Sequence, residues 1–413
     1  MRERYRWVVL GVATFTQAAS GFFVQGIGAM GVHLQRDLGL STAQLGLLLS
    51  AAQLAPLVGL LVAGELLDRH DERWVVGAGA CVVAVSLGVG GTTRTYESLL
   101  LVLLAVGAGY STVQPGGSKS VASWFDTSQR GLAMGIRQAG LPLGGALAAA
   151  TLPALAAELG LRAALTAGAL VALLGAVAFV ALYRRPPARP LPGSPGGSLG
   201  SRSRTLREPA MVRTVVSGMS LVSVHSGIGV LTALYLHEVT ALEAGPAALV
   251  LVAVQGAGVA GRVCLAAWSD RGRSGRHTCV LTCVAAVTVG MSALATPVGR
   301  SPVAACLVFV WLGFFGIGWY GPWVAHVAES APPGRTGFAL GAAMAANQIA
   351  VVLAPPALGL VKDLTGGFTA PWLLLSALTA VTLPATASGR HRPRRYGPAE
   401  AVREQDTNEV SGH

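Results

Sequence analysis

The chain has 413 residues, of which 52% are hydrophobic and only 12% are charged. This charged fraction is about half of what soluble globular domains carry, so the composition excludes an ordinary soluble fold and favours a lipid environment. The net charge of +11 does not indicate a nucleic-acid-binding protein, because the basic residues fall in short loops between apolar runs.

Apolar runs recur along nearly the whole chain, and each is long enough to cross a hydrocarbon core about 30 Å thick. They lack the alternation of a membrane β-barrel, so they are predicted to be helices. The sequence therefore predicts an all-α integral membrane protein with twelve transmembrane helices. In chain order these are 7–32, 43–66, 74–93, 97–122, 131–157, 162–183, 211–236, 245–268, 277–297, 302–327, 336–361 and 369–388.

Two polar stretches divide the chain. Residues 184–210 are rich in Pro, Gly and Ser, which predicts a flexible cytoplasmic linker between six-helix bundles at 1–183 and 211–389. The polar tail, 390–413, is predicted to be a disordered cytoplasmic segment. Arg and Lys concentrate in the loops of one side, which predicts that both termini are cytoplasmic. The Arg-, Ala- and Gly-rich composition is typical of a GC-rich bacterial genome, so we expect a multi-pass protein of the bacterial cytoplasmic (inner) membrane.

The chain carries an internal repeat. An Asp-Arg pair follows the second predicted helix at Asp68, and another follows the eighth at Asp270, 202 positions later. Gly131 and Gly337 open the fifth and eleventh helices with similar sequences at an offset of 206. Two matches at nearly one offset indicate two halves of the same design, a common construction for secondary transporters.

At these motifs the chain resembles the major facilitator superfamily. The run Gly64-x-x-x-Asp68-Arg69-x-x-x-Arg73 is similar to the signature loop of that family, although Asp71 replaces its usual glycine. The run 140–145, GLPLGG, is similar to the family's glycine-proline motif, but the fourth helix lacks the arginine that many members carry. The resemblance implies two pseudo-symmetric six-helix bundles and transport by alternating access.

The Asp-Arg loops are the candidate gates. Asp68 lies at the end of its helix, where it can pair with Arg73 or with a helix end across the gap between the halves. Such a contact can break as the halves rock, whereas the alternative is a plain helix cap with topology-setting charge. The predicted gating residues are Asp68, Arg69, Arg73, Asp270 and Arg271.

Ionisable residues inside spans are costly and are candidates for function. Arg262 lies eight residues before Asp270, about 12 Å into its helix, and Gln255 lies seven residues earlier on the same face. Arg suits bidentate capture of a carboxylate, although it can also snorkel or pair with Asp270. The position resembles that of the helix 8 Arg in monocarboxylate and oxalate transporters of the superfamily.

Three further ionisable residues lie at depth. Arg137 is about 10 Å into the fifth helix, and the resemblance places that helix opposite the eighth, so two cations would favour an anion. The alternative for Arg137 is a structural charge near the cytoplasmic mouth. Lys119 is either a third cation of the cavity or a snorkelling side chain. His225 near the midplane either carries a coupling proton or is a packing histidine.

Neutral polar groups at depth either line a cavity or bond between helices. The strongest of them complete the predicted site. The predicted substrate-binding residues are Arg262, Arg137, Gln255, Gln17, Gln114, Asn347, Tyr110 and His225.

The sequence predicts a transporter rather than an enzyme, because it has no Walker loop, metal-ligand spacing or nucleophile elbow. No Asp or Glu lies mid-membrane, which argues against a proton-driven drug antiporter. We therefore predict a secondary active transporter of a small carboxylate-type anion, resembling the anion:cation symporter and monocarboxylate branches. The expected partners are that anion, a coupling proton or cation and the bilayer, with no cofactor and a monomeric state. The alternatives are an exporter of hydrophobic or drug-like compounds and a non-transporting membrane sensor.

Overall fold

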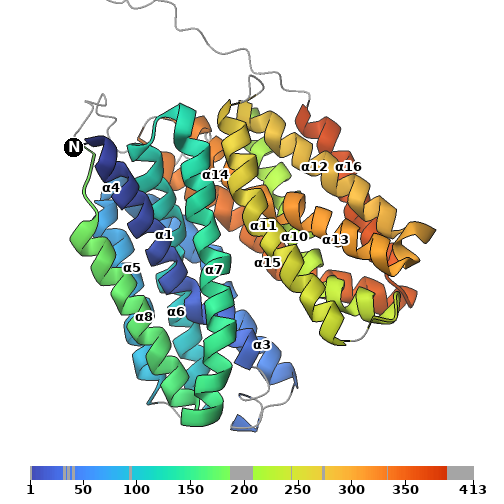
Figure 1. Ribbon diagram of the computed structural model, residues 1–413. Helices are drawn as coiled ribbons and strands as arrows, with labels where there is room; N and C mark the ends of the chain where they lie inside the picture. The colour runs from blue at the N-terminus through green and yellow to red at the C-terminus, as the bar shows by residue number, and fades with distance from the viewer. Residues whose placement is uncertain are drawn as a thin grey trace, which may run out of the picture.

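The computed structural model describes residues 2–30, 34, 38–39, 42–92, 95–186, 208–242, 244–271, 275–332 and 334–387. Its helices form two bundles that lie side by side (Figure 1). The first half comprises α1 (Arg2–Gly26), η1 (Ile27–Met30), α3 (Thr42–Leu54), α4 (Pro56–Arg69), α5 (Glu72–Gly90), α6 (Tyr96–Trp124), α7 (Thr127–Leu159) and α8 (Leu161–Leu182). The second comprises α10 (Pro209–Glu238), α11 (Ala244–Arg271), α12 (Gly275–Leu294), η2 (Pro297–Arg300), α13 (Pro302–Gly318), α14 (Tyr320–Ser330), α15 (Thr336–Thr365) and α16 (Thr369–Ala387).

The predicted architecture of twelve membrane crossings is confirmed. Eleven helical stretches of the described residues are long and apolar enough to span a bilayer, with α13 and α14 forming one of them. The twelfth crossing is α3 followed by α4, two shorter helices separated at Ala55 because Pro56 cannot donate a backbone hydrogen bond. The outer surfaces carry exposed apolar side chains such as Val58, Leu170 and Leu249, as lipid contact requires.

Part of the predicted organisation falls on residues that the structure does not describe. Residues 187–207 of the predicted linker and the whole predicted tail, 390–413, lie outside the described ranges. The linker, the tail and the orientation in the membrane therefore stay predictions. We call the end of the molecule at which α1 begins and α16 ends the terminal face.

The two halves meet through α4 against α15 and α7 against α11. From the terminal face, α7 and α11 diverge toward the opposite end (Figure 1). Glycines allow the close approach: a methyl group on Gly64 would lie 2.8 Å from the carbonyl oxygen of Gly337. A methyl group on Gly337 would lie 2.6 Å from a carboxylate oxygen of Asp68. A larger residue at either position would force the helices apart.

Each half closes the terminal face with an aspartate that caps a helix of the other half. Asp68 accepts backbone hydrogen bonds from Gly337 at 2.8 Å and Phe338 at 2.7 Å, at the start of α15. Asp270 likewise accepts from Gly131 at 2.8 Å and from Leu132 at 2.7 Å, at the start of α7. Helix N-termini present unpaired N–H groups and partial positive charge, so a carboxylate is stabilised there. We call these contacts the Asp68 latch and the Asp270 latch.

The latches confirm the repeat and correct part of the predicted gate. Asp68 meets a helix end across the halves, as one alternative proposed, and does not pair with Arg73. The Arg73 side chain instead donates from Nε to the carbonyl of Val180 at 2.6 Å. Arg69 pairs with Glu65 one turn earlier on α4, and Arg271 is exposed at the end of α11. The arginines of the two Asp-Arg pairs therefore lie beside the latches rather than in them.

Buried cations support both latch carboxylates. Lys119 lies 3.4 Å from Asp68 and 3.2 Å from Glu72, so it belongs to the terminal face and is not a third cation of a central cavity. Arg276 contacts Asp270 at 2.6 Å and Glu329 at 2.7 Å. Because these cations balance the carboxylates, the closed interface holds no isolated buried charge at either aspartate.

We predict that Asp68→Asn shifts the protein toward a form open at the terminal face. The substitution removes the charge that faces the N-terminus of α15, a loss of about 1–2 kcal/mol, which corresponds to roughly a 5- to 30-fold change in the equilibrium. Spin labels at His70 and Arg271, both exposed at the terminal face, would report a larger population of long distances. The matched control is Arg69→Gln, because Arg69 takes no part in the latch; a distance distribution that is unchanged by Asp68→Asn contradicts the prediction.

Candidate functional site

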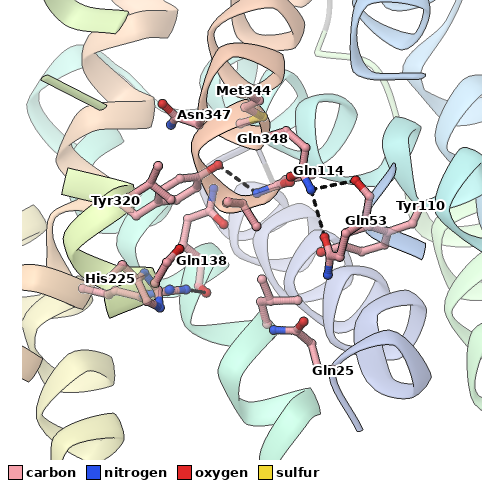
Figure 2. Close-up of a pocket in the computed structure, with 15 residues that line it drawn as sticks. Gln25, Gln53, Tyr110, Gln114, Gln138, His225, Tyr320, Met344, Asn347 and Gln348 are labelled. Atoms are coloured by element: carbon pink, nitrogen blue, oxygen red, sulfur yellow. Dashed lines mark hydrogen bonds between the residues drawn. The ribbon is translucent and has the colours of Figure 1, made fainter. Parts of the chain in front are cut away.

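A cavity of about 200 Å³ lies between the two halves. Figure 2 shows amide and hydroxyl side chains converging on it from helices of both halves. The residues that line it are Gln25, Gln53, Tyr110, Gln114, Gln138, Leu141, Val222, His225, Ser226, Arg262, Tyr320, Met344, Asn347, Gln348 and Val351.

The lining is polar, cationic and rich in amides. Arg262 is the only arginine or lysine among the lining residues, and none of them is Asp or Glu. The guanidinium of Arg262 is buried, with 5% of the residue exposed. A desolvated guanidinium without a carboxylate partner attracts an anion, since buried charge favours pairing.

Arg262 connects the two halves at the cavity. Its Nη1 donates to the backbone carbonyl of Gln138 on α7 at 2.6 Å, and its Nε donates to the carbonyl of Ile317 on α13 at 3.3 Å. The ring of Tyr320 lies 6.0 Å from the guanidinium carbon. Within the described part of the chain these bonds use Nε and one N–H of Nη1, so Nη2 and the second N–H of Nη1 can bind a ligand.

Several polar atoms of the lining are buried and have no hydrogen-bond partner among the residues that the structure describes. These are both amide atoms of Asn347, the hydroxyl of Tyr110 and Nε2 of Gln138. Unpaired buried polar atoms are uncommon, because each costs about 1–3 kcal/mol. Their presence around one cavity indicates a polar ligand that supplies the missing partners.

Other polar residues of the lining pair across the halves. Gln114 on α6 donates to the hydroxyl of Tyr320 on α14 at 2.9 Å. Gln348 on α15 donates to the backbone and side-chain oxygens of Gln53 on α3, at 2.9 and 3.0 Å. Dashed lines mark both pairs in Figure 2. The cavity wall is therefore itself part of the contact between the halves.

The structure brings five of the eight predicted site residues to the cavity, and their roles in binding stay predictions. The five are Arg262, Gln114, Asn347, Tyr110 and His225.

The predicted position of Arg137 is wrong. Its side chain is fully buried against α6, where it donates to Ser118 Oγ at 2.8 Å and to the carbonyls of Val113 and Gln114. Its neighbour Gln138 faces the cavity, and one residue along a helix turns the side chain by about 100°. Arg137 therefore stabilises α6 against α7 within one half.

Gln17 and Gln255 also lie away from the cavity lining. Gln17 is buried and donates to the side-chain oxygen of Gln138 at 2.9 Å, so Gln138 stands between it and the cavity. Gln255 is exposed on α11. It shares a helix face with Arg262, but seven residues carry it about 10 Å along the axis, beyond the reach of so small a cavity.

Six polar lining residues were not among the predicted site residues. They are Gln25, Gln53, Gln138, Ser226, Tyr320 and Gln348. Polar character at membrane depth was a usable signal for most of them, but it does not distinguish a cavity wall from a contact between helices. Which of these positions face the centre depends on helix rotation, which only tertiary packing sets.

The chain is similar to known transporters in sequence and fold. It is 27% identical over 392 residues to an uncharacterised MFS-type transporter of Mycobacterium tuberculosis, covering 92% of this chain and 84% of that protein. It is 29% identical over 151 residues to a probable L-galactonate transporter of Escherichia coli, which is 37% of this chain and 33% of that one.

Among solved structures, FucP in the outward conformation superimposes with a TM-score of 0.77 at 16% identity. The match covers 92% of this chain and 97% of FucP, and it supports the fold alone. The sequence also matches the family model of the Major Facilitator Superfamily over residues 13–355. The chain belongs to the Major Facilitator Superfamily and is a membrane transporter of that family.

Proposed function

We propose that this protein carries a small polyhydroxylated organic acid across the membrane by alternating access. One observation supports this above others: Arg262 is the single arginine or lysine among the described residues that line the cavity, and nine of the other fourteen carry an amide or a hydroxyl group. A carboxylate matches the guanidinium, and hydroxyl groups match the amides, which both donate and accept hydrogen bonds.

The amide-rich lining narrows the predicted anion class. A simple monocarboxylate would use Arg262 but would leave both amide atoms of Asn347 and the Tyr110 hydroxyl without partners. A sugar acid supplies several hydroxyl groups for these atoms. The similarity to a probable L-galactonate transporter supports the same class of substrate, a hexonate or related acid.

Alternating access follows from where the contacts between the halves lie. The Asp68 and Asp270 latches close the terminal face, while Arg262, Gln114 and Gln348 bridge the halves at the cavity. The opposite state requires these bonds to break together as the halves rock. If the terminal face is cytoplasmic, as the loop charges predict, the described state has its cytoplasmic side closed.

The alternatives receive less support from the cavity. An exporter of hydrophobic compounds would present few polar groups, whereas nine of the fifteen lining residues here carry an amide or a hydroxyl group. A non-transporting sensor would bind the same anion without flux. His225 lines the cavity, which supports the alternative in which it carries a coupling proton. Counterflow assays test transport without knowledge of the coupling ion.

We predict that Arg262→Gln abolishes exchange of sugar acids in proteoliposomes and that Arg262→Lys retains only weak exchange. Lysine keeps the charge but cannot bind a carboxylate with two parallel hydrogen bonds. Counterflow of radiolabelled L-galactonate and D-glucuronate, with nitrate and lactate for comparison, measures this directly. Wild-type protein that exchanges no anion would contradict the proposed function, and binding without exchange would favour a sensor.

The variant Arg137→Gln tests whether Arg137 stabilises the fold or binds substrate. Arg137 donates its side-chain hydrogen bonds to α6, and their loss costs about 1.5–3 kcal/mol of stability. We expect a lower melting temperature with a substrate KM within about twofold of wild type in the protein that remains folded. A large rise in KM with unchanged thermal stability would contradict the assignment.

We predict that Asn347→Ala weakens binding of hydroxylated acids about 10- to 100-fold and weakens nitrate binding less, because a hydroxyl group can satisfy both unpaired amide atoms of Asn347 whereas nitrate can only accept. Competition in the counterflow assay gives the relative affinities. The control is Met344→Leu, which changes another lining residue at similar volume. Equal losses for hydroxylated and simple anions would exclude the hydroxyl contact.

A further inference from the structure

We propose that Pro142 is a positioning residue, because it leaves the Gln138 carbonyl without an intrahelical donor. This carbonyl holds the Arg262 guanidinium in the empty cavity, and the substrate carboxylate displaces the carbonyl from Arg262. The inference rests on the proposed function for its last step only.

The freedom of the Gln138 carbonyl follows from the sequence of α7. That helix runs without interruption from Thr127 to Leu159 and contains Pro142. In an α-helix the carbonyl of residue 138 accepts from the N–H of residue 142, and proline has no N–H. A carbonyl without a partner inside a membrane protein is costly, and Arg262 Nη1 supplies the missing donor at 2.6 Å.

The second acceptor of Arg262 lies at a helix break. Ile317 stands in the last turn of α13, and α14 begins at Tyr320 after the interruption at Trp319. The last carbonyls of a helix lack intrahelical donors. The Arg262 guanidinium therefore bonds to one carbonyl in each half, and both carbonyls lack an intrahelical donor.

The repeat shows that this arrangement belongs to one interface only. At the offset of 206 residues, Pro142 corresponds to Gln348, which keeps its backbone N–H. The counterpart of the Gln138 carbonyl is therefore satisfied within α15, and the counterpart of Arg262 at the offset of 202 is Leu60. The latches are repeated in both halves, but the free carbonyl and its arginine are not.

In the absence of substrate, the Gln138 carbonyl accepts the hydrogen bond from Arg262 that the substrate carboxylate would accept. A carboxylate carries a full negative charge and can engage two nitrogens of the guanidinium at once, so it binds a guanidinium more strongly than a neutral carbonyl does. A carboxylate bound through Nη1 and Nη2 competes with the Gln138 carbonyl for the N–H groups of Nη1. Because that bond crosses between the halves, anion binding loosens one of the contacts that hold them together, so affinity and conformation become linked.

Chemical labelling of Arg262 tests the positioning role without a known substrate. The full-length protein in nanodiscs is treated with phenylglyoxal, and modification of each arginine is followed by peptide mass spectrometry. In Pro142→Ala the new N–H satisfies Gln138 within α7, so Arg262 should be modified about tenfold faster than in wild type, the size expected for a charged hydrogen bond. The same variant should need several-fold less L-galactonate to protect Arg262.

Two controls keep the result specific. Pro153→Ala removes the other proline inside α7, and it should leave the modification of Arg262 unchanged. Arg137 precedes Gln138 directly and is fully buried, so it reports general loosening of α7. Equal rates for Arg262 in Pro142→Ala and wild type, or a parallel rise at Arg137, would overturn the proposal. Faster modification in Pro142→Ala without protection by any anion would support the positioning role and contradict the proposed function.

Discussion

Backbone carbonyls in the middle of a membrane protein need donors inside the protein, and this constraint organises the interface of the two halves. Pro142 in α7 and the interruption between α13 and α14 leave carbonyls without intrahelical donors, and a buried arginine needs acceptors. Arg262 satisfies both requirements, because its guanidinium donates hydrogen bonds to the carbonyls of Gln138 and Ile317. The central charge is thus satisfied in the absence of ligand, yet by acceptors weaker than a carboxylate.

The two halves make equivalent contacts at the terminal face, where the interface closes, and different contacts at the cavity, where substrate would bind. At the terminal face, Asp68 and Asp270 make equivalent contacts with the first residues of α15 and α7. At the cavity, Gln348 bonds to Gln53 on one interface, whereas Pro142 and Arg262 occupy the other. Symmetric closure lets the halves rock as similar bodies, and an asymmetric cavity gives an anion one orientation.

Sequence reasoning identified what composition and spacing encode. Helix ends agree with the structure to within about five residues, since apolar runs and loop charges mark them directly. The Asp68 latch was foreseen as one of two alternatives because a carboxylate at a helix end has few other roles. Arg262 was identified because a charge at membrane depth is expensive.

Helix rotation and side-chain packing could not be predicted from the sequence in the same way. Arg137 and Gln138 are both polar neighbours that could face the cavity, and only the contact of α7 with α6 decides that the arginine turns away. Lys119 was ambiguous for the same reason, until its distance from Asp68 and Glu72 placed it in the latch. The bond from Arg262 to Gln138 joins residues 124 positions apart, and no local pattern predicts it.

The most direct test of anion recognition by Arg262 is an experimental structure of the protein with bound L-galactonate. The account predicts the carboxylate on Nη1 and Nη2 of Arg262, hydroxyl groups at Asn347, and a longer separation between Arg262 and the Gln138 carbonyl. An anion bound away from Arg262, or one bound there while the bond from Nη1 to Gln138 persists, would contradict it.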